Sequence, residues 1–152
     1  MTLRLDSLNK EVLHKAIDLL SRREHAVLEL EKKLKSKAFS SDDISEVMSF
    51  LLEKDYVSDQ RYTETMIRSR TSKGYGWRYI QNELQQKGVS AALIKTLGQE
   101  QDIDWYHQAE LAYNKRFALK EIKDQKDKAK RIRFLQYRGF SIDEIMAVLQ
   151  TD

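Results

Sequence analysis

The sequence predicts an all-helical protein, an elongated tandem array of three three-helix repeats with about nine helices in total. Proline is absent and only five glycines occur in 152 residues, so nothing in the chain imposes the roughly 3 kcal/mol that proline costs inside a helix. Leu, Lys, Glu, Gln and Ala, which all favour helices, dominate the composition. A seven-residue block also recurs three times at a spacing of about fifty residues, which is typical of a repeat protein.

The recurring block reads LKSKAFS at 34–40, LQQKGVS at 84–90 and LQYRGFS at 135–141. A basic residue precedes a small one that can close a helix in the left-handed conformation, and the final serine can cap the next helix. The apolar residue before each serine would contact an isoleucine five positions later, as in a hydrophobic staple. These pairs are Phe39 and Ile44, Val89 and Ile94, and Phe140 and Ile145. We interpret the block as the joint between the second and third helices of each repeat.

The first repeat, assigned to residues 1–57, carries three apolar stripes at helical spacing. They run through Leu13, Ile17 and Leu20, then Val27, Leu30 and Leu34, then Ile44, Val47 and Leu51. Charged residues such as Asp6, Lys10 and Glu11 interrupt the first twenty residues. This segment is therefore expected to be neither a signal peptide nor a membrane span.

The second repeat, assigned to residues 58–100, shows the same pattern. Its stripes run through Tyr62, Thr63, Met66 and Ile67, then Trp77, Ile80 and Leu84, then Leu93, Ile94 and Leu97. A unit of about fifty residues buries little surface alone, so neighbouring repeats are expected to share interfaces.

The third repeat, assigned to residues 101–152, begins with a helix over roughly 103–118, whose stripe contains Tyr106, Leu111 and Tyr113. In the next helix Arg131 occupies the register of Leu30 and Ile80, and the stripe moves to another set. That set is Ala129, Ile132 and Leu135. A final helix follows the serine of the third joint, which completes nine helices.

Positive charge is distributed unevenly along the chain. The net charge is +3, but residues 1–57 hold 10 Lys and Arg against 11 Asp and Glu. Residues 60–88 hold 6 against 2, and residues 113–139 hold 10 against 3. This asymmetry indicates that the second and third repeats meet a polyanion or an acidic protein surface.

The residues needed for catalysis are not found in a recognisable arrangement. The chain has no cysteine, which excludes disulfides and thiolate chemistry and suits a cytoplasmic location. Gly74 and Gly76 are not followed by the GK[ST] of a phosphate-binding loop, and the three histidines lie far apart. The acidic pairs at 42–43 and 102–104 fall at expected helix starts, where they complement the helix dipole. We therefore expect a protein that is not an enzyme and that uses no cofactor or metal.

Two groups of basic residues remain as candidate binding residues for a filament or a nucleic acid. In the third repeat, Lys126, Lys130, Arg133 and Tyr137 recur at i, i+4, i+7 and i+11, which places them on one helix face. Basic residues interleaved with aromatic ones suit backbone phosphates and base stacking. The full set of candidates is Arg68, Arg70, Lys73, Arg78, Lys87, Lys126, Lys130, Arg131, Arg133, Tyr137 and Arg138.

These segments also resemble a known family. The stretches SRREHAVLELEKKL at 21–34, DYVSDQRYTETMIRSR at 55–70, KGYGWRYIQNELQQKGV at 73–89 and RFLQYRGF at 133–140 are similar, in order and spacing, to the RecX family of regulators of the RecA recombinase. The resemblance spans about residues 10–150. Ala26, Ala38, Asp55 and Thr63 depart from the residues usual in the family, at positions that concern turns and packing.

The resemblance implies a regulatory protein that binds along the RecA filament on single-stranded DNA. It implies inhibition of the ATPase, of strand exchange and of filament growth, and hence regulation of recombination, DNA repair and the SOS response. We expect a cytoplasmic monomer with no membrane contact. Whether the basic residues contact DNA directly or RecA carboxylates is left open by the sequence.

Two alternatives belong to other classes. A free DNA-binding regulator of the helix-turn-helix kind would act without RecA, although the third helices AALIKTL and IDEIMAVL lack the Asn, Gln and Arg that read bases. A purely structural scaffold would be insensitive to loss of Lys126, Lys130 and Arg133.

Overall fold

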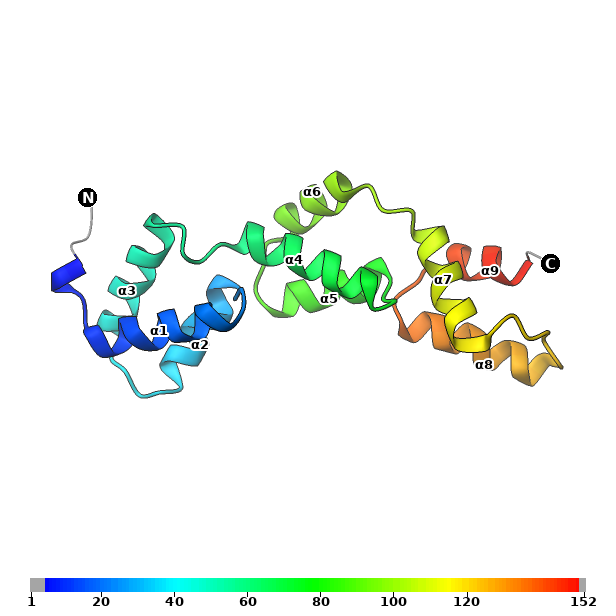
Figure 1. Ribbon diagram of the computed structural model, residues 1–152, viewed down its shortest axis with the longest axis horizontal. Coiled ribbons are helices and arrows are strands. Elements are labelled where there is room, and N and C mark those ends of the chain that lie inside the picture. Colours follow the sequence, from blue (N-terminus) through cyan, green and yellow to red (C-terminus); the bar gives the residue numbers. More distant parts are fainter. Residues whose placement is uncertain (1–4, 151–152) are drawn as a thin grey trace. The chain divides into compact units, whose positions relative to one another are not determined.

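A computed structural model describes residues 5–150 (Figure 1); the first four residues of the N-terminal segment discussed above lie outside this range. Within it the chain forms nine α-helices and no strand, which confirms the all-helical class. A short 3-10 turn, Leu5–Ser7, precedes them. The helices are α1 (Lys10–Arg22), α2 (Val27–Lys35), α3 (Ser41–Glu53), α4 (Asp59–Ser72), α5 (Trp77–Gln86), α6 (Ala91–Gln101), α7 (Trp105–Phe117), α8 (Gln125–Tyr137) and α9 (Ile142–Gln150).

The chain divides into two compact units. Unit 1 comprises the residues up to Thr65 together with Gln85–Ile94, and unit 2 comprises Met66–Leu84 together with the residues from Lys95 onward. The division falls within α4, α5 and α6, so the first and third three-helix groups each lie in a single unit.

In unit 1, helices α1, α2 and α3 contact one another around an apolar core. The predicted stripes of α2 and α3 are confirmed, since Leu30, Leu34, Ile44, Val47 and Leu51 are all buried. The expected place of Ile17 in the core is wrong, because its side chain is 43% exposed. The preceding alanine at position 16 is fully buried in its place, since one step along a helix turns a side chain by about 100°.

The three joints have the predicted geometry. Ala38, Gly88 and Gly139 have φ of 63°, 85° and 97°, the left-handed conformation that ends a helix. The serine Oγ atoms then accept hydrogen bonds from the amides three residues later, at 3.2 Å in each joint. The third joint adds a complete capping box, because Glu144 Oε1 accepts from the amide of Ser141 at 2.9 Å. The seven-residue block therefore determines where the chain changes direction at each joint.

In unit 2, helices α7, α8 and α9 contact one another around Leu135, Phe140 and Ile145. The expected core positions of Tyr106 and Leu111 are wrong, since these side chains are 53% and 49% exposed. The expected core position of Tyr113 is confirmed, and Ala109 and Ala112 complete the core face of α7. Small alanines allow the α7 backbone to approach α9 closely. A prediction that looks for large apolar residues does not find such a core face.

The start of α5 is bonded to the third joint within unit 2. The amide of Gly76 donates to the carbonyl of Arg138 at 2.6 Å, and the amide of Arg78 donates to the carbonyl of Gly139 at 3.1 Å. A Cβ at Gly76 would lie 2.6 Å from the carbonyl carbon of Gly139, so only glycine fits there. These bonds satisfy amides that every helix start leaves without an internal partner, and they fix Arg138 beside the end of α4.

Among the residues described, no helix combines the length and apolar character that crossing a bilayer requires.

Candidate functional site

The exposed face of α8 carries a row of cations. Asp124 caps this helix by accepting from the amide of Asp127 at 2.8 Å. From that start, the spacing of Lys126, Lys130 and Arg133 places all three on one face, and all three are exposed. Tyr137 continues the row with a side chain that is 82% exposed. We call these four residues the α8 face.

A surface hollow of about 480 Å³ adjoins the α8 face. It is bordered by the end of α7, by the loop that follows it and by α8, and Lys and Arg outnumber Asp and Glu among its lining residues. The loop brings in Lys120 and Lys123, and α7 brings in Arg116. The hollow therefore extends the positive surface of the α8 face, and its chemistry is that of an anion-binding surface.

Arg131 lies inside unit 2 and holds the loop that borders this hollow. Its side chain is only 4% exposed. Nη1 donates to Tyr113 Oη at 2.6 Å and to the carbonyl of Lys120 at 2.7 Å, and Nη2 donates to the carbonyl of Glu121 at 3.1 Å and to Asp127 Oδ2 at 3.1 Å. Burial opposes its charge, but the bonds to Tyr113 and Asp127 raise its pKa above the ordinary value. Arg131 consequently shapes the basic hollow without being exposed on it.

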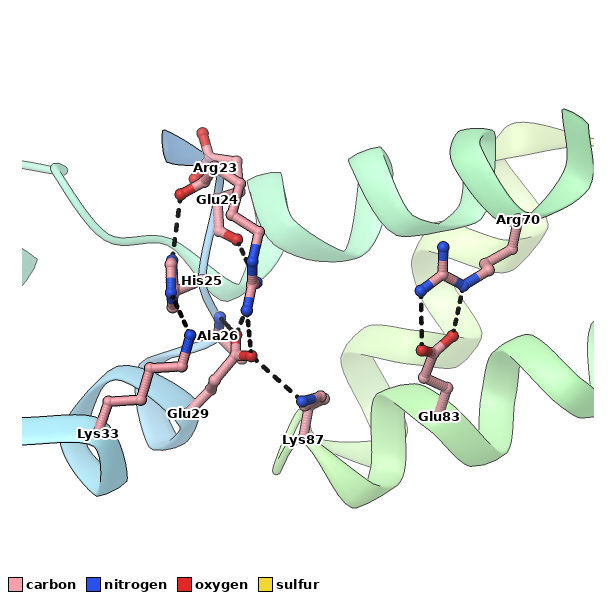
Figure 2. A network of polar contacts seen from close by, with 9 residues as sticks. All are labelled: Arg23, Glu24, His25, Ala26, Glu29, Lys33, Arg70, Glu83 and Lys87. Atoms are coloured by element: carbon pink, nitrogen blue, oxygen red, sulfur yellow. Dashed lines mark hydrogen bonds and ion pairs between the residues drawn. The ribbon is translucent and has the colours of Figure 1, made fainter. Parts of the chain in front are cut away.

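The remaining candidate residues fall into two groups. Arg68, Lys73 and Arg78 are exposed. Three others form ion pairs or hydrogen bonds within the protein. Arg70 forms a two-pronged ion pair with Glu83 at 2.8 and 3.0 Å, Lys87 contacts Glu29 at 3.2 Å, and Arg138 donates to the carbonyl of Lys73 at 3.2 Å (Figure 2 shows the first two).

Unit 1 contains a polar cluster that the sequence does not predict, formed by Arg23, His25, Glu29, Lys33 and Lys87 (Figure 2). Glu29 is its centre, with a side chain only 7% exposed. It accepts from both terminal nitrogens of Arg23, at 2.7 and 3.1 Å, and from Lys87 Nζ at 3.2 Å. Burial alone would raise the pKa of Glu29, but the hydrogen bonds and charges of Arg23 and Lys87 outweigh it and lower the pKa to about 2. We call this the Glu29 cluster.

His25 lies in the same cluster and is neutral. Its Nδ1 lies 3.1 Å from the carbonyl of Arg23, so Nδ1 must be the donor, and its Nε2 lies 3.0 Å from Lys33 Nζ, so Nε2 must accept. Burial and the nearby cations Arg23 and Lys33 lower the pKa of the ring. His25 is fully buried, with an exposed fraction of only 1%.

Some of the residues missing from the predicted set had a signal in the sequence, and others had none. Arg116, Lys120 and Lys123 all lie in the basic segment 113–139, so charge counting alone could have included them. The Glu29 cluster had no such signal, because Glu29 and Lys87 are 58 positions apart.

The described part of the chain contains no group of three or more His, Asp or Glu side chains suited to a metal ion. Its polar groups form ion pairs, caps and a basic surface. Three-helix groups, one of which presents an exposed cationic helix face, define an all-helical repeat protein with a basic surface.

Comparison with known proteins identifies the family. Three family models match in order: the first three-helix domain of RecX at residues 13–51, the second at 58–96 and the third at 102–149. The chain belongs to the RecX family.

Relatives and solved structures agree with this assignment. The chain is 44% identical to the Regulatory protein RecX of Vibrio parahaemolyticus over 134 residues, which is 88% of this chain and 86% of that one. It is 38% identical to the Regulatory protein RecX of Pseudomonas fluorescens over 149 residues, which is 98% of this chain and 96% of that one. The crystal structure of RecX from Lactobacillus salivarius has the same fold, with a TM-score of 0.73 at 21% identity over 93% of this chain and 94% of that one.

Proposed function

We propose that this protein binds the RecA filament on single-stranded DNA and inhibits its ATPase, its strand exchange and its growth. It thereby regulates recombination and DNA repair as part of the SOS response. It acts in the cytoplasm as a monomer, has no catalytic activity of its own and needs no cofactor. Membership of a family of regulatory proteins supports the general role, and the α8 face is the single structural observation that supports a charged partner.

The α8 face supports this function because its four residues are exposed and aligned. Three cations along one helix can contact successive phosphates or carboxylates, and an exposed tyrosine can stack on a base or an apolar side chain. Individual surface contacts of this kind are weak, so several of them spread over one chain are needed for useful affinity.

The other candidate residues differ in how directly they can contact a partner. Arg68, Lys73 and Arg78 add exposed positive charge from the second repeat. Arg138 contributes a charge that is held in place by a backbone carbonyl, whereas Arg70 and Lys87 contribute charges that Glu83 and Glu29 partly offset. Arg131 supports the surface by holding the loop 118–124.

The proposal is tested with RecA on single-stranded DNA. Added substoichiometrically, the protein should lower ATP turnover, and the triple variant Lys126→Gln/Lys130→Gln/Arg133→Gln should lose most of that inhibition. A matched control is Lys10→Gln/Lys54→Gln/Lys95→Gln, which removes the same charge from exposed positions outside the proposed surface. It should inhibit as the unmodified protein does. Unchanged ATP turnover at stoichiometric protein would refute the proposal.

The same variants separate the alternatives. A free DNA-binding regulator would bind duplex DNA tightly and sequence-specifically without RecA, and would leave ATP turnover unchanged. A structural scaffold would inhibit equally with and without the α8 cations. Circular dichroism of each variant shows whether the helices have survived the substitutions.

A further inference from the structure

A second hollow in unit 2, which shares only Arg116 with the one beside the α8 face, gathers cations without carboxylates. It measures about 210 Å³ and is lined at the end of α4, on α7 and on α8. Its charged lining residues are Lys73, Lys115, Arg116 and Arg138, and the described lining contains no Asp or Glu. We call it the Phe134 hollow, after the aromatic residue in its wall. Four positive charges gathered in this way repel one another unless an anion joins them.

The two arginines of this hollow are held against aromatic rings. The guanidinium carbon of Arg138 lies 4.8 Å from the ring centre of Tyr75 and 5.2 Å from that of Phe134. That of Arg116 lies 5.8 Å from the same Phe134 ring. A guanidinium that contacts a ring with its face keeps its N–H edges available for an acceptor. One ring therefore positions two arginines whose donor edges can serve the hollow.

The backbone around the hollow is fixed by hydrogen bonds within unit 2. Arg138 Nη1 donates to the carbonyl of Lys73 at 3.2 Å. The carbonyl of Arg138 accepts from the amide of Gly76 at 2.6 Å, and the amide of Tyr75 closes α4 by donating to the carbonyl of Arg70 at 3.0 Å. Arg138 is consequently preorganised, which lowers the entropy lost when a ligand binds to it.

Helix dipoles explain only part of this gathering. Lys73 follows the end of α4, Arg116 lies in the last turn of α7, and Arg138 ends α8, so each cation complements the negative end of a helix. Each helix end is equivalent to about −0.5 of an elementary charge. Three such ends leave more than half of the four positive charges without compensation.

We propose that the Phe134 hollow binds a phosphate group. Donors reach it from three helices, so they approach from several sides, which suits the tetrahedral oxygens of phosphate better than the two coplanar oxygens of a carboxylate. The phosphate can belong to a single-stranded nucleic acid or be free in solution, because the recognising chemistry is the same. This inference does not depend on the proposed action on RecA.

The test uses the full-length protein without RecA, so the two proposals can fail independently. Inorganic phosphate is titrated at constant ionic strength, and the amide resonance of Gly74, which lines the hollow, is followed by NMR. A saturable shift is expected. In a second arm, fluorescence anisotropy measures binding of a labelled oligothymidylate and its competition by inorganic phosphate.

The double variant Lys115→Gln/Arg116→Gln removes two exposed cations of the hollow, and Lys54→Gln/Lys95→Gln removes the same charge elsewhere. Lys115→Gln/Arg116→Gln should weaken phosphate binding by about tenfold or more, because losing even one charge-assisted contact costs about that much. Lys54→Gln/Lys95→Gln should leave phosphate binding unchanged. If the oligonucleotide uses the hollow, the first variant should also reduce the slope of log K against log salt by about 0.7 per lost phosphate contact.

Saturable phosphate binding that is lost only in the first variant supports the proposal. Competition between phosphate and oligonucleotide then assigns the phosphate to a nucleic acid, and its absence assigns it to free phosphate. No saturable effect of either probe overturns the proposal, as do equal losses in both variants. Binding of a polyglutamate peptide at Gly74 without phosphate binding overturns it as well, in favour of an acidic protein partner. Continued inhibition of RecA in any of these cases leaves the proposed function intact.

Discussion

The Glu29 cluster makes unit 1 sensitive to the substitution Glu29→Gln. Glutamine keeps the shape of the side chain but removes the negative charge that faces Arg23 and Lys87 at 2.7 and 3.2 Å. At pH 7 the variant leaves two cations beside a neutral amide at a position whose side chain is only 7% exposed. We therefore expect a loss of stability that exceeds that of an ordinary surface ion pair.

The pKa of Glu29 gives the size of this loss. A pKa lowered from 4.5 to about 2 corresponds to about 3 kcal/mol, since one unit is worth about 1.4 kcal/mol. The side chains of Arg23 and Lys87 are 47% and 40% exposed, so solvent screens part of the interaction. We expect the free energy of unfolding at pH 7 to fall by about 2 to 3 kcal/mol.

The pH dependence follows from the direction of the shift. The folded state holds the pKa of Glu29 below its unfolded value, so the stabilisation is complete above about pH 4.5 and is lost as the pH falls toward 2. The difference in stability between the unmodified protein and Glu29→Gln should therefore shrink to less than half by about pH 3. Acid destabilisation from other groups is common to both proteins and cancels in the difference.

Urea unfolding followed by circular dichroism at pH 7, 4.5 and 3 measures these values. Glu31→Gln is the matched control, because Glu31 lies on the same helix in an exposed pair with Lys35 at 3.6 Å. It should change stability by less than about 0.5 kcal/mol. If Glu29→Gln costs no more than this control, or costs the same at pH 7 and pH 3, the assigned role of Glu29 is wrong.

Three further predictions concern single buried groups. Arg131→Met should lower the free energy of unfolding by about 3 kcal/mol and speed amide hydrogen exchange in the loop 118–124, because the loop carbonyls lose their donors. His25 should titrate below its usual pKa of 6.5 in an NMR titration, and since its folded pKa is lowered, its contribution to stability is lost as the pH falls below 6.5. Thr63→Val should raise stability by about 1 kcal/mol, because the buried hydroxyl has no hydrogen-bond partner and valine has the same shape.

Each of these has an outcome that contradicts it. Unchanged exchange in the loop 118–124 would show that Arg131 does not hold it. A His25 pKa at or above 6.5 would show that burial beside Arg23 and Lys33 does not disfavour the charged ring. A destabilised Thr63→Val protein would indicate that the hydroxyl is satisfied, and Thr63→Ser, which keeps the hydroxyl and loses the methyl group, is the control.

The sequence predicted the repeats because the information that defines them is local. A left-handed residue, a capping serine and a staple all lie within a few positions of one another, so Ala38, Gly88 and Gly139 could be recognised as helix ends from their neighbours alone. The same approach found only Tyr113 on the core face of α7. The other two residues of that face are alanines, and their burial depends on how closely α9 packs, which periodicity does not contain.

The sequence by itself thus determined the fold class, the repeat joints and the uneven distribution of positive charge, all of which depend on residues near one another along the chain. The tertiary structure decided which cations are exposed and which are engaged. Arg131 and Lys126 were both candidate binding residues, yet Arg131, in the register of Leu30 and Ile80, is buried against Tyr113, and Lys126 faces solvent. Lys87 reaches Glu29 across 58 positions. The physical reason is that an ion pair depends on distance in space, which only the packing of the helices sets.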